Sequence, residues 1–148
     1  AKPVKNARAI VVVHKNQIVG ERYAADYGFF PHTPQLGWSM TKSLMSVLIG
    51  IRMNQAHDDD HDSFPHFDDP INRNVPEWRN LPFNVTLKDL LRMESGLDFA
   101  DEYSIGGGVV KMLFRSDDTA HFAALRPFSA FPGTKFAYSS GVSNILSR

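Results

Sequence analysis

The sequence predicts an α/β protein in which a β-hairpin precedes a mainly helical region. Residues 7–14 are largely apolar and β-branched, as in a buried strand, and residues 18–23 can return beside them after a short polar turn. Residues 39–54 have the length of a helix and are apolar on nearly every side. Further helix signals follow residue 86. We therefore expect a small sheet followed by a helical lobe that is centred on a buried helix.

The composition is that of one globular domain with a hydrophobic core. Of the 148 residues, 43% are hydrophobic and 22% are charged. The 16 basic and 16 acidic residues leave no net charge, so no global field would draw the protein to nucleic acid or to an anionic membrane. The absence of cysteine excludes disulfides and thiol chemistry. No apolar segment is long enough to cross a bilayer, and both a secreted or periplasmic and a cytoplasmic location stay open.

The segment over residues 57–69 is rich in aspartate and histidine and is predicted to be a solvated loop. Asp58, Asp60 and Asp62 match the first three ligand positions of an EF-hand calcium loop. The sixth position, however, is Ser63 instead of glycine, and the twelfth is an aspartate instead of glutamate. We therefore expect no metal site here.

The second half of the chain is predicted to alternate short helices with turns. Residues 69–78 indicate a helical turn between prolines, and residues 86–93 indicate a helix that Thr86 caps and Gly96 ends. Residues 106–108 are three glycines that predict a flexible hinge. Because no Lys-Ser/Thr pair follows them, they do not indicate a phosphate loop. The remaining expected elements are a helix over 117–125, a turn at 131–134 and a helix that begins at Gly141.

Ser39 and Lys42 stand three residues apart at the start of the apolar helix. Residues at this spacing lie on one helix face, so the hydroxyl and the amine can share a small site. Partial enclosure and the positive end of the helix dipole would favour the neutral amine that a general base requires. The alternative is structural, because serine is a favoured helix N-cap and Lys42 would then be a surface residue. With 12 Ser and 7 Lys in the chain, one such pair can also arise by chance.

Four segments, taken in order along the chain, match motifs of one known family. They are residues 39–42 (SMTK), residues 69–78, residues 86–97 (TLKDLLRMESGL) and residues 131–140 (FPGTKFAYSS). They resemble, in turn, the S-x-x-K motif, the DDPV…LPE stretch, the T-I-R-x-L-L-x-M-T-S-G-L segment and the PGT-x-F-x-Y-S run of the serine β-lactamase and penicillin-recognising superfamily. The most similar branch holds the class C β-lactamases with related esterases, D-aminopeptidases and 6-aminohexanoate oligomer hydrolases.

The resemblance implies an α/β fold of the serine β-lactamase type, with an antiparallel sheet beside a helical lobe. Residues 1–148 would be the N-terminal portion of one such domain, with the first sheet strands in residues 1–30 and the helical lobe in residues 39–148. Family members are more than twice this long, so we expect a truncated chain. The missing C-terminal half is expected to be required for activity.

The resemblance also implies a serine hydrolase that forms an acyl-enzyme with an amide, ester or β-lactam carbonyl and uses no cofactor. Ser39 would be the nucleophile, Lys42 would accept its proton, and Tyr138 would pass a proton to the leaving group. Ser140 replaces the asparagine that is common in the family's Tyr-x-Asn motif. It is expected to contact substrate, but it offers only a hydroxyl, which favours an ester or amide over a β-lactam.

The third motif of the family, a Lys- or His-x-Gly strand expected to carry the second oxyanion donor, is absent from residues 1–148. Two alternatives to an active hydrolase therefore stay open. One is a catalytically silent relative that binds peptides or acyl groups. The other is a structural fragment that another chain completes.

Overall fold

The computed structural model describes residues 6–57 and 64–148, and the chain divides into two compact units, Ala1–Gly37 and Trp38–Arg148. The first unit carries a two-stranded antiparallel sheet and the second carries the helices. The coarse α/β prediction is thus confirmed. Over these described ranges, every helix is too short or too polar to serve as a membrane span.

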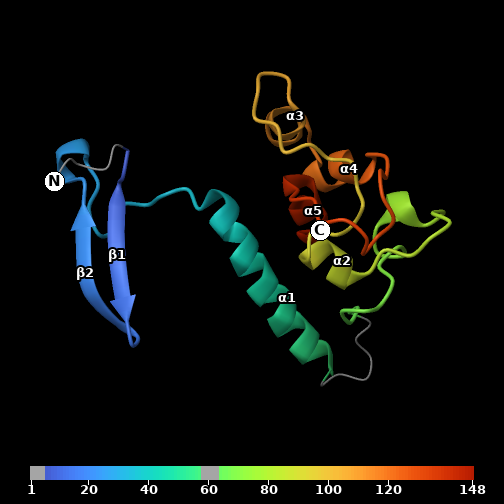
Figure 1. Ribbon diagram of the computed structural model, residues 1–148, viewed down its shortest axis with the longest axis horizontal. Coiled ribbons are helices and arrows are strands. Elements are labelled where there is room, and N and C mark those ends of the chain that lie inside the picture. The colour runs from blue at the N-terminus through green and yellow to red at the C-terminus, as the bar shows by residue number, and fades with distance from the viewer. Residues whose placement is uncertain (1–5, 58–63) are drawn as a thin grey trace. The chain divides into compact units, whose positions relative to one another are not determined.

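The first unit is a β-hairpin followed by a single 3-10 turn (Figure 1). Strand β1 (Ala9–His14) pairs with β2 (Gln17–Tyr23), and the register shifts between Val12 and Val13. Lys15 and Asn16, which connect the strands, have φ angles of 47° and 63°. Two successive positive φ angles are typical of the type I′ turn that matches the twist of a hairpin. The predicted hairpin is therefore confirmed.

The strands are more exposed than their sequence suggests. All six residues of β1 are exposed, and Ile18 of β2 retains 63% of its accessible surface. The first unit has two strands and one short turn, Ala25–Tyr27, so its described residues supply no second layer to pack on either face of the sheet. The expectation of a buried strand is wrong within this unit.

The helix predicted over residues 39–54 begins as a 3-10 turn, Trp38–Met40, and continues as α1 (Thr41–His57). One face of α1 packs on the core of the second unit through Met45, Ile49 and Met53. These positions recur every four residues, as a single helix face requires. Most of the other apolar residues of α1 are exposed: Leu44, Val47, Leu48 and Ile51. Burial on all sides is therefore wrong among the described residues, because the core covers only one face.

The core of the second unit is built around Trp78, which is 1% exposed. It ends the 3-10 turn Pro76–Trp78, so the predicted turn between prolines is confirmed. Its indole Nε1–H donates to the carbonyl of Ala124 at 2.9 Å, and its ring packs edge-on against Phe128. A buried Trp with a satisfied N–H combines a large apolar contact area with a fixed orientation.

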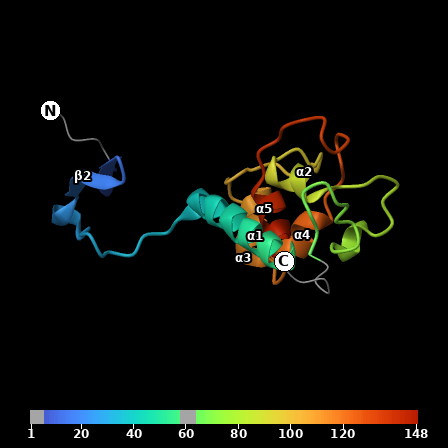
Figure 2. The ribbon, with the colours of Figure 1, turned by 90° about the horizontal axis from the view of Figure 1, so that it is seen from below.

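Four short helices surround this core: α2 (Leu87–Leu91), α3 (Gly108–Arg115), α4 (Thr119–Ala124) and α5 (Ser140–Leu146) (Figures 1 and 2). Helix α4 lies inside the predicted range, and α5 begins one residue before the predicted start. Helix α3 was not predicted, because the glycines before it indicated a hinge. The structure instead uses Gly107 as the N-cap of this helix.

Helix α2 begins as predicted and ends earlier than predicted. The side chain of Thr86 accepts from the Asp89 N–H, and the Asp89 carboxylate accepts from the Thr86 N–H, which completes a capping box. The helix stops at Leu91, and the left-handed residue that follows is Met93, with a φ of 59°. Gly96 therefore does not end the helix. It also has a positive φ, but its role is to let the Ala130 carbonyl approach.

The acidic loop predicted at 57–69 lies only partly within the described residues. Asp58, Asp60, Asp62 and Ser63, on which the calcium-loop comparison depended, fall outside them. Asp69 is described, and its carboxylate accepts from the backbone N–H of His66 at 2.9 Å. Within the described residues, no group of three or more His, Asp or Glu side chains is arranged to hold a metal ion.

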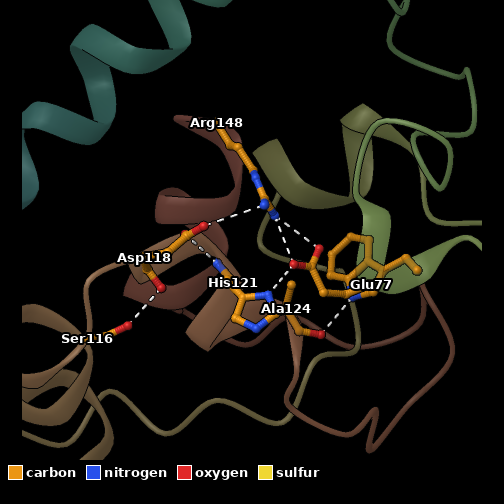
Figure 3. Close-up of polar contacts among 7 residues, drawn as sticks. Glu77, Ser116, Asp118, His121, Ala124 and Arg148 are labelled. Atoms are coloured by element: carbon orange, nitrogen blue, oxygen red, sulfur yellow. Dashed lines mark hydrogen bonds and ion pairs between the residues drawn. The ribbon is translucent and has the colours of Figure 1, made fainter.

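A polar cluster joins Arg148, at the end of the chain, to Glu77 in the 3-10 turn Pro76–Trp78 (Figure 3). Both carboxylate oxygens of Glu77 accept from Arg148 at 3.0 Å, and one of them also contacts Nδ1 of His121 in α4. The Glu77 side chain is only 7% exposed. Burial would raise the pKa of Glu77, but the hydrogen bonds from His121, its own backbone and Arg148 outweigh burial and lower the pKa to about 2.

Candidate functional site

Ser39 lies in the 3-10 turn that leads into α1, and Lys42 lies in the first turn of that helix. Lys42 is half-buried because it stands three residues before Met45, on the packed face of α1. The predicted partial enclosure of the amine is confirmed. Trp38, directly before Ser39, has a φ of 44°, a left-handed conformation that bulky residues rarely adopt. Strain of this kind often accompanies a functional position.

Tyr138 is brought to the site by a segment that pairs with the chain after α2. The Ala137 N–H donates to the Met93 carbonyl at 2.8 Å, and the Gly133 N–H donates to the Glu94 carbonyl at 2.8 Å. Directly after Tyr138, Ser139 caps α5, with its buried hydroxyl accepting from a backbone N–H of the first turn. Tyr138 is therefore positioned by backbone hydrogen bonds on its N-terminal side and by the start of α5 on its C-terminal side.

Three of the predicted residues meet at one oxygen atom. The Tyr138 hydroxyl donates to Ser39 Oγ at 2.8 Å, and Lys42 Nζ donates to the same oxygen at 3.1 Å. The Lys42 amine also lies over the Tyr138 ring, 5.0 Å from its centroid. Ser39 and Tyr138 are 99 residues apart in sequence, so this meeting is a property of the fold and not of local helix geometry.

The electrostatics of this arrangement act on Tyr138. The hydrogen bond with Ser39 lowers the pKa of Tyr138, and partial burial opposes that effect. The hydrogen bond and the positive charge of Lys42 lower the pKa further, while the Asp101 carboxylate raises it. The net result is a pKa below the ordinary value of 10.0. A phenol with a lowered pKa gives up and regains a proton more readily near neutral pH.

Ser140, the fourth predicted residue, also reaches the site. Lys42 Nζ donates to Ser140 Oγ at 3.3 Å. The carboxylate of Asp101 accepts both from the Ser140 backbone N–H, at 2.6 Å, and from its hydroxyl, at 2.9 Å. Asp101 was not among the predicted site residues. It belongs to no motif and lies 39 residues before its partner, so no local pattern could have identified it.

Clefts of about 270 and 390 Å³ flank the Ser39–Lys42 pair. The larger combines apolar side chains with hydroxyl and amide groups, which is typical of a site for a small organic molecule. Its lining includes Trp38, Tyr103, Leu113, Ser140 and Asn144. The smaller is lined in part by Met45, Leu91, Met93, Tyr138 and Leu146. Both clefts include Ser39 and Lys42 in their lining.

A comparison with models of protein families gives a match to the family described as Beta-lactamase, over residues 6–148. This chain belongs to the beta-lactamase family. The resemblance inferred from the four sequence motifs is thereby confirmed. A comparison with curated individual proteins gives no match. Membership of the beta-lactamase family indicates a hydrolase-type function and a small-molecule substrate.

Proposed function

We propose that the protein is a serine hydrolase of the serine β-lactamase type, in which Ser39 forms an acyl-enzyme with an amide, ester or β-lactam carbonyl. The observation that carries this proposal is the meeting of Tyr138 and Lys42 at Ser39 Oγ, at 2.8 and 3.1 Å. A nucleophile within hydrogen-bond reach of a base and a second proton carrier is the arrangement that acyl transfer requires. Membership of the beta-lactamase family supports the same reaction class.

Acylation would begin at Ser39 Oγ, which attacks the carbonyl carbon while its proton passes to the Lys42 amine; for this step Lys42 has to present a lone pair to Ser39 Oγ in place of the N–H that it donates in the structure. The carbonyl oxygen takes the negative charge, and the Ser39 backbone N–H at the start of the helical turn is proposed as one donor to it. When the intermediate collapses, the bond to the leaving nitrogen or oxygen breaks, and Tyr138 supplies the proton that this atom needs.

Deacylation would use the same groups in reverse. A water molecule attacks the acyl carbon, Tyr138 takes its proton, and Ser39 regains a proton as the acid leaves. The lowered pKa of Tyr138 supports this role, because a phenolate is needed to activate the water. The substrate would lie in the larger cleft, with Ser140 at its wall.

Covalent labelling with a fluorophosphonate probe tests the proposal. The full gene product is expected to carry one probe adduct, located at Ser39 by peptide mass spectrometry, and Ser39→Ala should abolish it. Lys42→Ala should slow labelling by about 10²–10⁴-fold, the usual contribution of a general base. Ser129→Ala, which removes an exposed hydroxyl outside both clefts, is the matched control and should label at the wild-type rate.

Two results would contradict a hydrolase. If Ser39 in the folded full-length protein takes no adduct, a silent binding protein explains the site better. If the adduct forms but no ester, amide or β-lactam is turned over, Ser39 is a reactive nucleophile in a protein without hydrolase activity. We further propose that residues 1–148 need the remainder of the intact protein for activity, since a second oxyanion donor typically contributes about 10²–10³-fold. Labelling of the 148-residue chain beside the full gene product checks this.

A further inference from the structure

The carboxylate of Asp101 accepts two hydrogen bonds from Ser140. One oxygen accepts from the Ser140 backbone N–H at 2.6 Å, and the other accepts from the Ser140 hydroxyl at 2.9 Å. Ser140 is 7% exposed and Asp101 is half-buried, so water competes weakly for these contacts. Hydrogen bonds to an ionised acceptor are among the stronger ones in proteins.

These two hydrogen bonds fix the direction in which the Ser140 O–H bond points. A serine hydroxyl has one proton to donate and two lone pairs that accept. Since the proton is committed to Asp101, the oxygen presents a lone pair to Lys42, whose Nζ donates to it at 3.3 Å. Lys42 therefore has two acceptors, Ser140 Oγ and Ser39 Oγ, and the second is the proposed nucleophile.

The segment that carries Asp101 is itself held in place. A side chain on Gly141 in α5 would lie 2.6 Å from the ring of Phe99, so this ring packs directly on the helix backbone. A side chain on Gly107 at the start of α3 would lie 2.5 Å from the carbonyl of Glu102. Contacts on both sides of Asp101 thus anchor it against α3 and α5.

We propose that Asp101 is a positioning residue that acts through Ser140 to hold the Lys42 amine at Ser39. The inference rests on the proposed function, because it assigns Asp101 a part in activating the same nucleophile. It also limits Ser140: with its proton committed, Ser140 can bind a substrate only as an acceptor, for example from an amide N–H.

A double-mutant cycle tests whether Asp101 works through Ser140. Asp101→Asn keeps the size of the side chain but turns an acceptor into an amide donor, which competes with Lys42 for the oxygen of Ser140. We expect Asp101→Asn and Ser140→Ala each to lower the maximal rate of fluorophosphonate labelling about tenfold, with the probe concentration for half-maximal rate little changed. The double variant should label no more slowly than the slower single variant, because each substitution breaks the same chain of contacts from Asp101 through Ser140 to Lys42.

The matched control is Glu102→Gln, which removes the neighbouring carboxylate, an exposed one, and should label at the wild-type rate. Circular dichroism and thermal melting confirm that each variant is folded. If the losses of Asp101→Asn and Ser140→Ala multiply in the double variant, or if Asp101→Asn labels like wild type, Asp101 has no role through Ser140. A wild-type protein that takes no label instead overturns the proposed function, and with it this inference.

Discussion

Ser39 Oγ is the point at which two proton-carrying groups from distant parts of the chain meet. Helix spacing alone brings Lys42 to it, because the two residues lie three positions apart. Tyr138 reaches it only through the pairing of its segment with the chain near Met93. The Ser-Lys pair is therefore predictable from local sequence, whereas the position of Tyr138 depends on long-range structure that only a family resemblance could supply.

Removing the Ser39 hydroxyl should raise the pKa of Tyr138. The hydrogen bond with Ser39 is the largest cause of the lowered value, so Ser39→Ala leaves only the smaller effects of Lys42 to oppose burial and Asp101. NMR titration of tyrosine labelled with ¹³C at Cζ would measure this shift. Tyr23 is an internal reference, because a hydrogen bond to Glu21 raises its pKa and it is far from Ser39 in sequence. An unchanged Tyr138 titration would show that the contact with Ser39 is weak in solution.

At the scale of elements, α5 depends on a close approach that only glycine permits. Gly141→Ala would place a methyl group 2.6 Å from the Phe99 ring, so the ring or the helix must move. We expect a loss of about 1–3 kcal/mol in the free energy of unfolding, as is usual for overpacking. Because Phe99 lies two residues before Asp101, probe labelling should also slow. Urea denaturation monitored by circular dichroism measures the first effect.

Gly50 in the middle of α1 is the matched control for this substitution. It is exposed, and a side chain there would meet nothing within 4 Å. Gly50→Ala should therefore stabilise the protein by roughly 0.5–1 kcal/mol, because alanine is the better helix former. Should Gly141→Ala be as stable as Gly50→Ala, the close packing of Phe99 on α5 would be wrong.

The elements that could be predicted are those whose signals are local. The hairpin follows from β-branched residues around a turn, and the start of α2 follows from a capping box within four residues. Helix α3 was missed because Gly106–Gly108 dominated the pattern, although Val109 and Met112 behind them are fully buried. Burial itself is not local, since an apolar helix such as α1 does not reveal how many of its faces will find a partner.

The hydrogen bonds between Ser140 and Asp101 show the same limit of prediction from local sequence. An aspartate in a loop between two helices is most often a solvated residue, and nothing in the residues around it indicates otherwise. Its contact with Ser140, which lies 39 residues later at the start of α5, appears only in the folded structure. Motifs therefore indicated the residues that meet at Ser39, whereas the proposed role of Asp101 rests on the folded structure alone.

At the scale of the whole molecule, the Glu77 cluster links elements that are far apart in sequence (Figure 3). Arg148 is 71 residues from Glu77, and His121 is 44 residues from it. A carboxylate that holds three segments together makes their association dependent on its charge. The stability of the second unit should therefore respond to acid through this one side chain.

The direction of that response follows from the pKa of Glu77, which is lowered from 4.5 to about 2 on folding. A lowered pKa contributes stability above the unfolded value, and this contribution is lost as the pH falls from about 4.5 through about 2. Each pKa unit is worth about 1.4 kcal/mol, so the full difference corresponds to about 3 kcal/mol. Because Arg148 and His121 are partly exposed, we expect solvent screening to leave about 1–2 kcal/mol.

Urea denaturation of the wild type and Glu77→Gln at pH values from 7 to 2 measures this contribution. Glu77→Gln should be less stable than wild type at pH 7, and the difference should shrink below pH 4.5 as the wild-type carboxylate begins to be protonated. Asp68→Asn is the control: its carboxylate is 81% exposed and pairs with Lys88 on the surface, so its loss should cost less than about 1 kcal/mol. If the difference between wild type and Glu77→Gln stays constant down to pH 2, the charge of Glu77 does not hold these segments together.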